Sequence, residues 1–213
     1  MIKVIAFERE YGSGAGAIAQ KLADRLGWAL WDKQITCEIA RRLKCKVEEV
    51  EKREERLDSA FYRLAKIFMR GSYEEAYTGS GMEMLDAESL SRSFERIIKD
   101  LANKGNCVIV GRAAPYFLRD HPDTFRLFTF APYEEKLRRL MAAGTSRSDA
   151  ERRLETVDEE RAAFIKRYYN KTWPSREIYH MMINTAAGDE AVIDLILTEI
   201  HILDRADSQQ RPA

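Results

Sequence analysis

Short apolar runs alternate with longer amphipathic segments along most of the chain. The apolar runs predict five strands, at Ile2–Phe7, Trp28–Trp31, Cys107–Val110, Phe125–Phe130 and His180–Asn184. A run such as Cys107–Val110, with no polar interruption, is typical of a parallel strand that is covered on both faces. Helical spacing of apolar residues predicts helices near 18–26, 35–70, 86–104, 132–141, 148–169 and 189–203. We therefore expect an α/β protein with three layers, αβα, around a five-stranded parallel sheet with right-handed crossovers.

Length and charge limit what this protein can be. The 213 residues suit a single domain over 1–204, followed by a polar tail at 205–213 that we expect to be disordered. The 35 basic and 35 acidic residues give no net charge, so we expect neither nucleic acid nor a membrane as a partner. Three cysteines without a Cys-x-x-Cys pair, and no apolar run of about 20 residues, favour a cytoplasmic protein.

A glycine-rich stretch joins the first strand to the first helix. Glycines at 12, 14 and 16 allow the backbone to approach an anion, and the start of a helix supplies unpaired N–H groups and a positive dipole end. The spacing Gly12-x-Gly14-x-Gly16 lacks the G-x-G-x-x-G step of a dinucleotide site, although Asp32 lies where a ribose-binding acid would be. The several residues between strand and first glycine favour a P-loop, with a purely structural turn as a further alternative.

Two polar residues, Asp32 and Arg112, come directly after predicted strands, so we expect both on the ligand-binding rim of the sheet. Arg112 could neutralise a transferring phosphoryl group, hold the phosphate of an acceptor, or be an ordinary surface arginine. Asp32 could bind the acceptor, hold Mg²⁺ through water, or cap the helix that follows.

Several motifs in order resemble one family. They are Glu8–Gly14 with Ile18-Ala19, Asp32-Lys33, Cys107–Arg112, Ala131-Pro132, Val157–Tyr169 and Ile183–Thr185. Together they resemble the cytidylate kinase-like family, a branch of the nucleoside monophosphate kinases. The resemblance implies a P-loop kinase fold with a helical monophosphate-binding insertion near 33–104 and a lid near 144–175. It also implies transfer of the γ-phosphate of ATP, with Mg²⁺, to cytidylate or a related small acceptor.

The chain departs from a monophosphate-kinase loop at important positions. Ala15 replaces the lysine, Ala17 replaces the hydroxyl that would hold Mg²⁺, and Arg9 replaces the first glycine. Gly16 stands where family members often have an arginine, and His180 where they tend to have an aspartate. Two alternatives follow: a nucleotide-binding protein with weak or lost catalysis, or a kinase for a small metabolite.

The candidate site residues fall into three groups, which bind phosphate, bind the acceptor, or act in catalysis and in the lid. The phosphate-binding residues are Gly12, Ser13, Gly14, Ala15, Gly16 and Ala17, and the acceptor-binding residues are Asp32 and Arg112. The catalytic candidates are Arg9, Arg112, Asp158 and Arg161, and the lid arginines are Arg153, Arg161 and Arg167. Arg9 could equally form a structural ion pair with a neighbouring glutamate. Asp158 and Arg161 share a helix face one turn apart and match the lid motif of the family.

Overall fold

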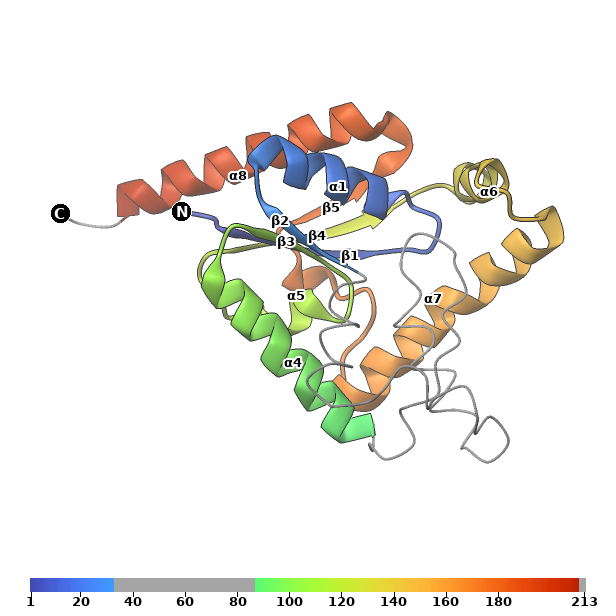
Figure 1. Cartoon of the computed structure of the whole chain (residues 1–213), viewed down its shortest axis with the longest axis horizontal. Helices are drawn as coiled ribbons and strands as arrows, with labels where there is room; N and C mark the ends of the chain where they lie inside the picture. Colours follow the sequence, from blue (N-terminus) through green and yellow to red (C-terminus); the bar gives the residue numbers. More distant parts are fainter. Residues whose placement is uncertain (33–86, 211–213) are drawn as a thin grey trace.

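The computed structural model describes residues 1–32 and 87–210 (Figure 1). The strands are β1 (Val4–Arg9), β2 (Ala29–Trp31), β3 (Cys107–Val110), β4 (Thr124–Phe130) and β5 (Met181–Asn184). The helices are α1 (Ala15–Leu26), α4 (Ala87–Lys104), α5 (Ala114–Phe117), α6 (Tyr133–Ala142), α7 (Arg147–Tyr169) and α8 (Asp189–Gln210), with 3-10 turns η1 (Arg176–Ile178) and η2 (Thr185–Ala187).

The five strands form one parallel sheet in the order β2-β3-β1-β4-β5. Phe7 of β1 lies in register between Val110 of β3 and Leu127 of β4. Because parallel strands end at the same edge, the segments that follow β1, β3 and β4 meet on one rim. The predicted five-stranded parallel α/β fold is confirmed.

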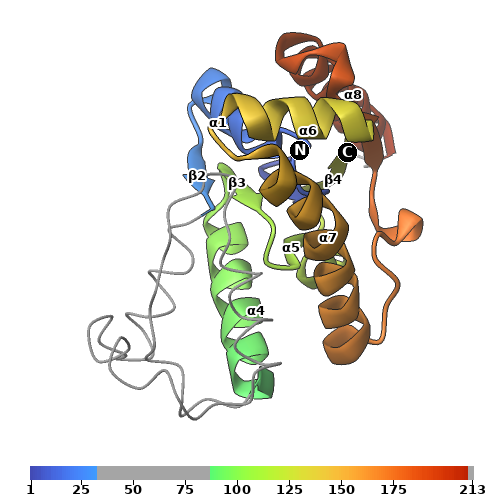
Figure 2. The same cartoon turned by 90° about the vertical axis from the view of Figure 1, so that its right-hand side faces the viewer.

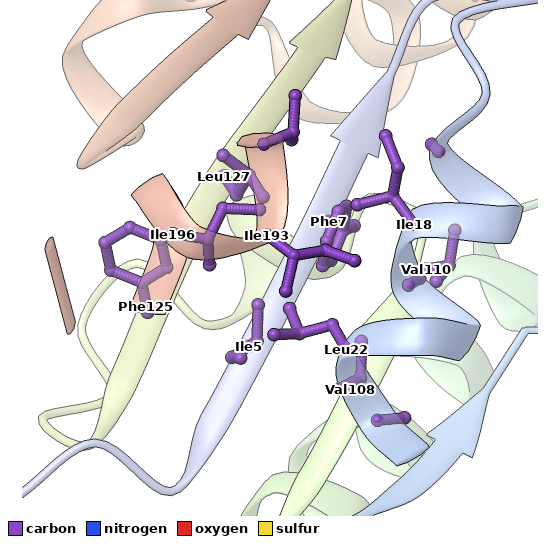
Figure 3. Close-up of a cluster of buried hydrophobic side chains, with 14 residues drawn as sticks. Ile5, Phe7, Ile18, Leu22, Val108, Val110, Phe125, Leu127, Ile193 and Ile196 are labelled. Carbon is purple, nitrogen blue, oxygen red and sulfur yellow. The ribbon is translucent and has the colours of Figure 1, made fainter. Parts of the chain in front are cut away.

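Helices α1 and α8 cover one face of the sheet. Ile5 and Phe7 of β1 pack against Leu22 of α1 and Ile193 of α8, and each of these side chains is fully buried (Figure 3). Burial of a side chain of this size contributes about 1.5–3 kcal/mol, so this cluster is a main source of stability and fixes the start of α1 at the end of β1.

Helices α4, α5 and α7 lie on the other side of the sheet (Figures 1 and 2). Ile97 and Ile98 of α4 pack on Val4 and Ala6 of β1. A separate cluster joins α5 to α7 through Tyr116, Phe164 and Ile165, among others. Packing against α5 places α7 near the rim at which the strands end.

Two boundaries differ from the sequence expectation. Helix α7 begins at Arg147, one residue before the predicted 148, because Ser146 is its N-cap and its Oγ accepts from the Asp149 N–H at 3.2 Å. Helix α8 continues to Gln210, so 205–210 is helical where we expected a disordered tail. The apolar pattern ends near Leu203, but the backbone can continue its hydrogen bonds without burial, and the Ser208 hydroxyl also bonds to the Asp204 carbonyl at 2.7 Å.

Residues 33–86 and 211–213 lie outside the described part, and with them most of the predicted insertion at 33–104 and the end of the tail. In the described part, none of the helices combines the length and the apolar character that crossing a membrane requires.

Candidate functional site

The glycine-rich loop leads into α1 with the backbone conformation of an anion-binding turn. Gly12 and Gly14 have φ values of 75° and 81°, in the left-handed region that a side chain would resist. Gly14 is the N-cap of α1 and provides no capping side chain, so the first amides of the helix have no such partner. Alternation of left-handed glycines before a helix builds a concave row of N–H groups, which is a favourable place for phosphate.

Bonds to strand β4 hold the loop in this shape. The Glu10 N–H donates to the Thr129 carbonyl at 2.9 Å, and the hydroxyls of Ser13 and Thr129 lie 3.3 Å apart. Ser13 is 1% exposed, so its hydroxyl faces the protein. Ala15 is also buried, as part of the apolar cluster under α1. The candidate cradle therefore consists of backbone groups.

A cation lies against the loop beside Gly14, the residue before Ala15. The Arg139 guanidinium, from α6, donates through Nη1 to the Ser13 carbonyl at 2.5 Å. A Cβ at Gly14 would lie only 2.8 Å from the same nitrogen. Glu135, one turn earlier on α6, accepts from Arg139 Nε at 2.8 Å and fixes the stem. Arg139 was not among our sequence candidates, although it brings a positive charge to the start of α1.

Side chains of helix α7 form hydrogen bonds to the backbone at the start of the loop, at Arg9 and Tyr11. Both Asp158 carboxylate oxygens accept from the Tyr11 N–H, at 2.9 and 3.1 Å. Arg161 Nη1 donates to the Arg9 carbonyl at 3.0 Å and to Asp158 at 2.8 Å. Burial raises the pKa of Asp158 and lowers that of Arg161. Asp158 and Arg161, both predicted site residues, therefore contact the loop backbone directly. Their opposite charges are paired with each other.

The two predicted rim residues meet beyond the ends of the adjacent strands β2 and β3. Arg112 Nη1 donates to Asp32 Oδ1 at 2.6 Å, and Arg112 is only 1% exposed. Burial lowers the pKa of Arg112, while the Asp32 charge acts in the opposite direction. The surface-arginine alternative for Arg112 is therefore wrong, because a fully buried guanidinium is not a surface group.

Arg9 is also buried, at 5% exposure, and its Nη1 lies 3.4 Å from the Glu8 carboxylate. Its guanidinium packs on Gly111, where a Cβ would lie 1.8 Å from Nη1. The structural ion pair that we considered from the sequence is thus present. It leaves Arg9 beside the end of β3, next to Arg112, so the two cations share one buried neighbourhood.

The Gly111 contact gives a direct test of this packing. Gly111→Ala is expected to destabilise the protein by about 1–3 kcal/mol, because φ is +72° and the methyl group would displace buried Arg9. Gly27→Ala is a matched control, since Gly27 has φ +66° and no atom within 4 Å of its Cβ position. Urea unfolding should show a larger loss for Gly111→Ala; equal losses would contradict the packing of Arg9 on Gly111.

A model of the cytidylate kinase-like family matches residues 4–187 of this sequence. The chain belongs to the cytidylate kinase-like family. The resemblance read from its motifs is thereby confirmed. A search of curated proteins found no match.

Solved structures similar to this family member share its fold. An uncharacterized protein from Eubacterium ventriosum ATCC 27560 has a TM-score of 0.63 at 23% identity, covering 94% of this chain and 99% of that one. A gluconokinase from Sinorhizobium meliloti 1021 has a TM-score of 0.56 at 13% identity, with 98% of each chain covered. Shikimate kinase from Acinetobacter baumannii has a TM-score of 0.51 at 16% identity, covering 93% and 94%. These similarities show the P-loop kinase fold.

Two predicted lid arginines of this cytidylate kinase-like protein contribute nothing to the contacts above. Arg153 is partly buried and Arg167 is exposed, both on α7. Their roles stay predictions, as does closure of 144–175 as a lid. The structure instead places Arg139 and Thr185 at the loop, and neither was a sequence candidate. The sequence showed only that Arg139 is a basic residue in a predicted helix and that Thr185 follows the last predicted strand.

Mg²⁺ would find few protein ligands here. No group of three or more His, Cys, Asp or Glu side chains suited to a metal occurs within residues 1–32 and 87–210. Ala17 has no hydroxyl, and the Asp32 carboxylate is bonded to Arg112. These residues fit an ion held mainly by nucleotide phosphates and water, which is the usual preference of Mg²⁺.

Proposed function

We propose that this protein is an ATP-dependent phosphotransferase that moves the γ-phosphoryl group to cytidylate or a related small acceptor. The observation that carries the proposal is the Arg139 guanidinium beside Gly14, the N-cap residue of α1, at the end of the glycine-rich loop. Family membership and the P-loop kinase fold support it. The nucleotide would place its phosphates along Gly12 to Ala17, at the carboxyl edge of the sheet.

The charge supplied by Arg139 is large enough to matter. The helix dipole stabilises an anion by about 0.3–1 kcal/mol at exposed sites, and about 2 kcal/mol when partly buried. A cation about 4 Å from a phosphate oxygen supplies about 4 kcal/mol at an effective dielectric constant near 20. Phosphoryl transfer depends on positioning and charge more than on a covalent catalyst. Arg139 can therefore take over part of the electrostatic role of the missing lysine, reduced by its own ion pair with Glu135 at 2.8 Å.

The acceptor would bind on the same rim, next to Asp32 and Arg112, so that an acceptor oxygen attacks the γ-phosphorus and ADP leaves. Asp32 holds Arg112 in place at 2.6 Å, and Arg9 lies nearby against Gly111. Mg²⁺ bound with ATP would neutralise charge on the phosphate oxygens. Asp158 and Arg161 would keep the loop backbone in its phosphate-binding shape.

A second candidate, a nucleotide-binding protein with weak or lost catalysis, has an observation in its favour. Arg9, Arg112 and Arg161 are each buried and each bonded to a carboxylate, namely Glu8, Asp32 and Asp158. An arginine already paired in this way gives a phosphate less uncompensated charge. In that case, closure of the lid near 144–175 on a bound nucleotide would be the output.

Binding and turnover separate the two candidates. Calorimetry with Mg-ATP measures nucleotide affinity, and ADP release is then followed with cytidylate, uridylate, adenylate and shikimate as acceptors. The phosphotransferase predicts that one monophosphate, cytidylate first, stimulates ADP release above the rate without acceptor. Stimulation by shikimate alone would favour a metabolite kinase. Tight ATP binding with no ADP formed in the presence of any of these acceptors would contradict the phosphotransferase and favour the binding protein.

A further inference from the structure

The turn after β5 contacts both the loop and its cation. Thr185, the first residue of η2, is fully buried. Its Oγ1 lies 2.6 Å from the Ser13 carbonyl and 2.8 Å from Arg139 Nη1. Its own carbonyl accepts from Arg139 Nη2 at 2.9 Å. One residue thus meets the loop backbone and both terminal nitrogens of the guanidinium.

The chemistry of these groups fixes the direction of each bond. A guanidinium only donates and a carbonyl only accepts, so the Thr185 hydroxyl must accept from Arg139 and donate its single proton to a carbonyl. The Ser13 carbonyl at 2.6 Å is a closer acceptor than that of Phe130 at 3.2 Å. Among threonine, serine, valine and alanine, only the two hydroxyl side chains can make both bonds.

We infer that Thr185 is a positioning residue, whose hydroxyl holds the Arg139 guanidinium over the phosphate loop. The inference rests on the proposed function, because it assigns Arg139 to the phosphates. The turn itself has other bonds: the Ala186 N–H donates to Asn184 Oδ1 at 3.0 Å, and the Gly188 N–H donates to the Thr185 carbonyl at 3.2 Å. Loss of the hydroxyl should therefore disorient Arg139 while the turn persists.

Calorimetric binding of inorganic tripolyphosphate to the full chain tests this inference without requiring catalysis. A lost hydrogen bond to a charged group predicts affinity about tenfold weaker for Thr185→Val. Thr185→Ser should retain wild-type affinity. Thr198→Val is a matched control, because the Thr198 hydroxyl bonds to a carbonyl of its own helix and is exposed. If Thr185→Val does not fold, Thr185→Ala removes the same hydroxyl and carries the same expectation.

A double substitution distinguishes positioning from a general structural effect. In an Arg139→Met background, Thr185→Val should cause no further loss of tripolyphosphate affinity, because the group it positions is absent. The inference is overturned by unchanged affinity of Thr185→Val, by a Thr185→Ser variant as weak as Thr185→Val, or by an equal loss in the Arg139→Met background. A wild-type chain that does not bind tripolyphosphate contradicts the proposed function instead.

Discussion

Replacement of Arg139 by methionine is expected to lower kcat for phosphoryl transfer about a hundredfold, the usual cost of removing one electrostatic donor from a reacting centre. Methionine keeps a long side chain on α6 but removes the charge and the bonds to Ser13 and Thr185. Arg139→Lys should be intermediate, because a point charge cannot reproduce the guanidinium fork. The rate of ADP formation at saturating ATP and acceptor measures the effect.

Arg138→Met is the matched control for Arg139. Arg138 is the preceding residue on α6 and also pairs with Glu135, at 2.6 Å, but its side chain is 68% exposed. We expect its kcat to stay close to wild type. Equal losses in the two variants would mean that α6 matters only through its net charge or its folding, and would contradict the assignment of Arg139 to the phosphates.

Arg112→Met is expected to have the largest effect on stability, about 3–5 kcal/mol, because it removes the ion pair of a buried carboxylate. Arg112 is 1% exposed, and Asp32, its partner at 2.6 Å, is 9% exposed. Urea unfolding followed by circular dichroism measures the free energy. The apolar double variant Arg112→Met/Asp32→Leu should recover much of the loss, since it leaves no carboxylate behind.

Arg119→Met serves as the control for this stability effect. Arg119 pairs with Asp120 at 3.0 Å, but the two side chains are 52% and 84% exposed, so the pair contributes little. Its free energy of unfolding should change by less than about 0.5 kcal/mol. An Arg112→Met variant as stable as Arg119→Met would contradict the buried Asp32 pair.

The sheet and the loop could be predicted because their signals are local. Apolar runs such as Cys107–Val110 mark covered parallel strands, and glycines before an amphipathic segment mark the start of α1. The cap of α7 was harder, since Ser146 and Ser148 each precede an acidic residue three positions later. Only the bond from the Asp149 N–H to Ser146 decides between them.

The cation of the site could not be predicted, because it depends on how distant elements pack. Nothing local to α6 shows that Arg139 faces a loop 126 residues earlier in the sequence. In the same way, the strand end identified Arg112 as a rim residue, but its burial depends on Asp32, 80 residues away. Sequence patterns locate the backbone cradle; tertiary contacts determine which charges reach it.

³¹P NMR of the protein with Mg-ATP and cytidylate shows whether this loop supports phosphoryl transfer without a P-loop lysine. We expect the ATP γ-phosphorus signal to decline while the diphosphate signals of ADP and of the phosphorylated cytidylate rise together. Arg139→Met should slow this transfer. Unchanged ATP in the presence of bound nucleotide, or release of inorganic phosphate alone, would mean that this loop does not support phosphoryl transfer to cytidylate.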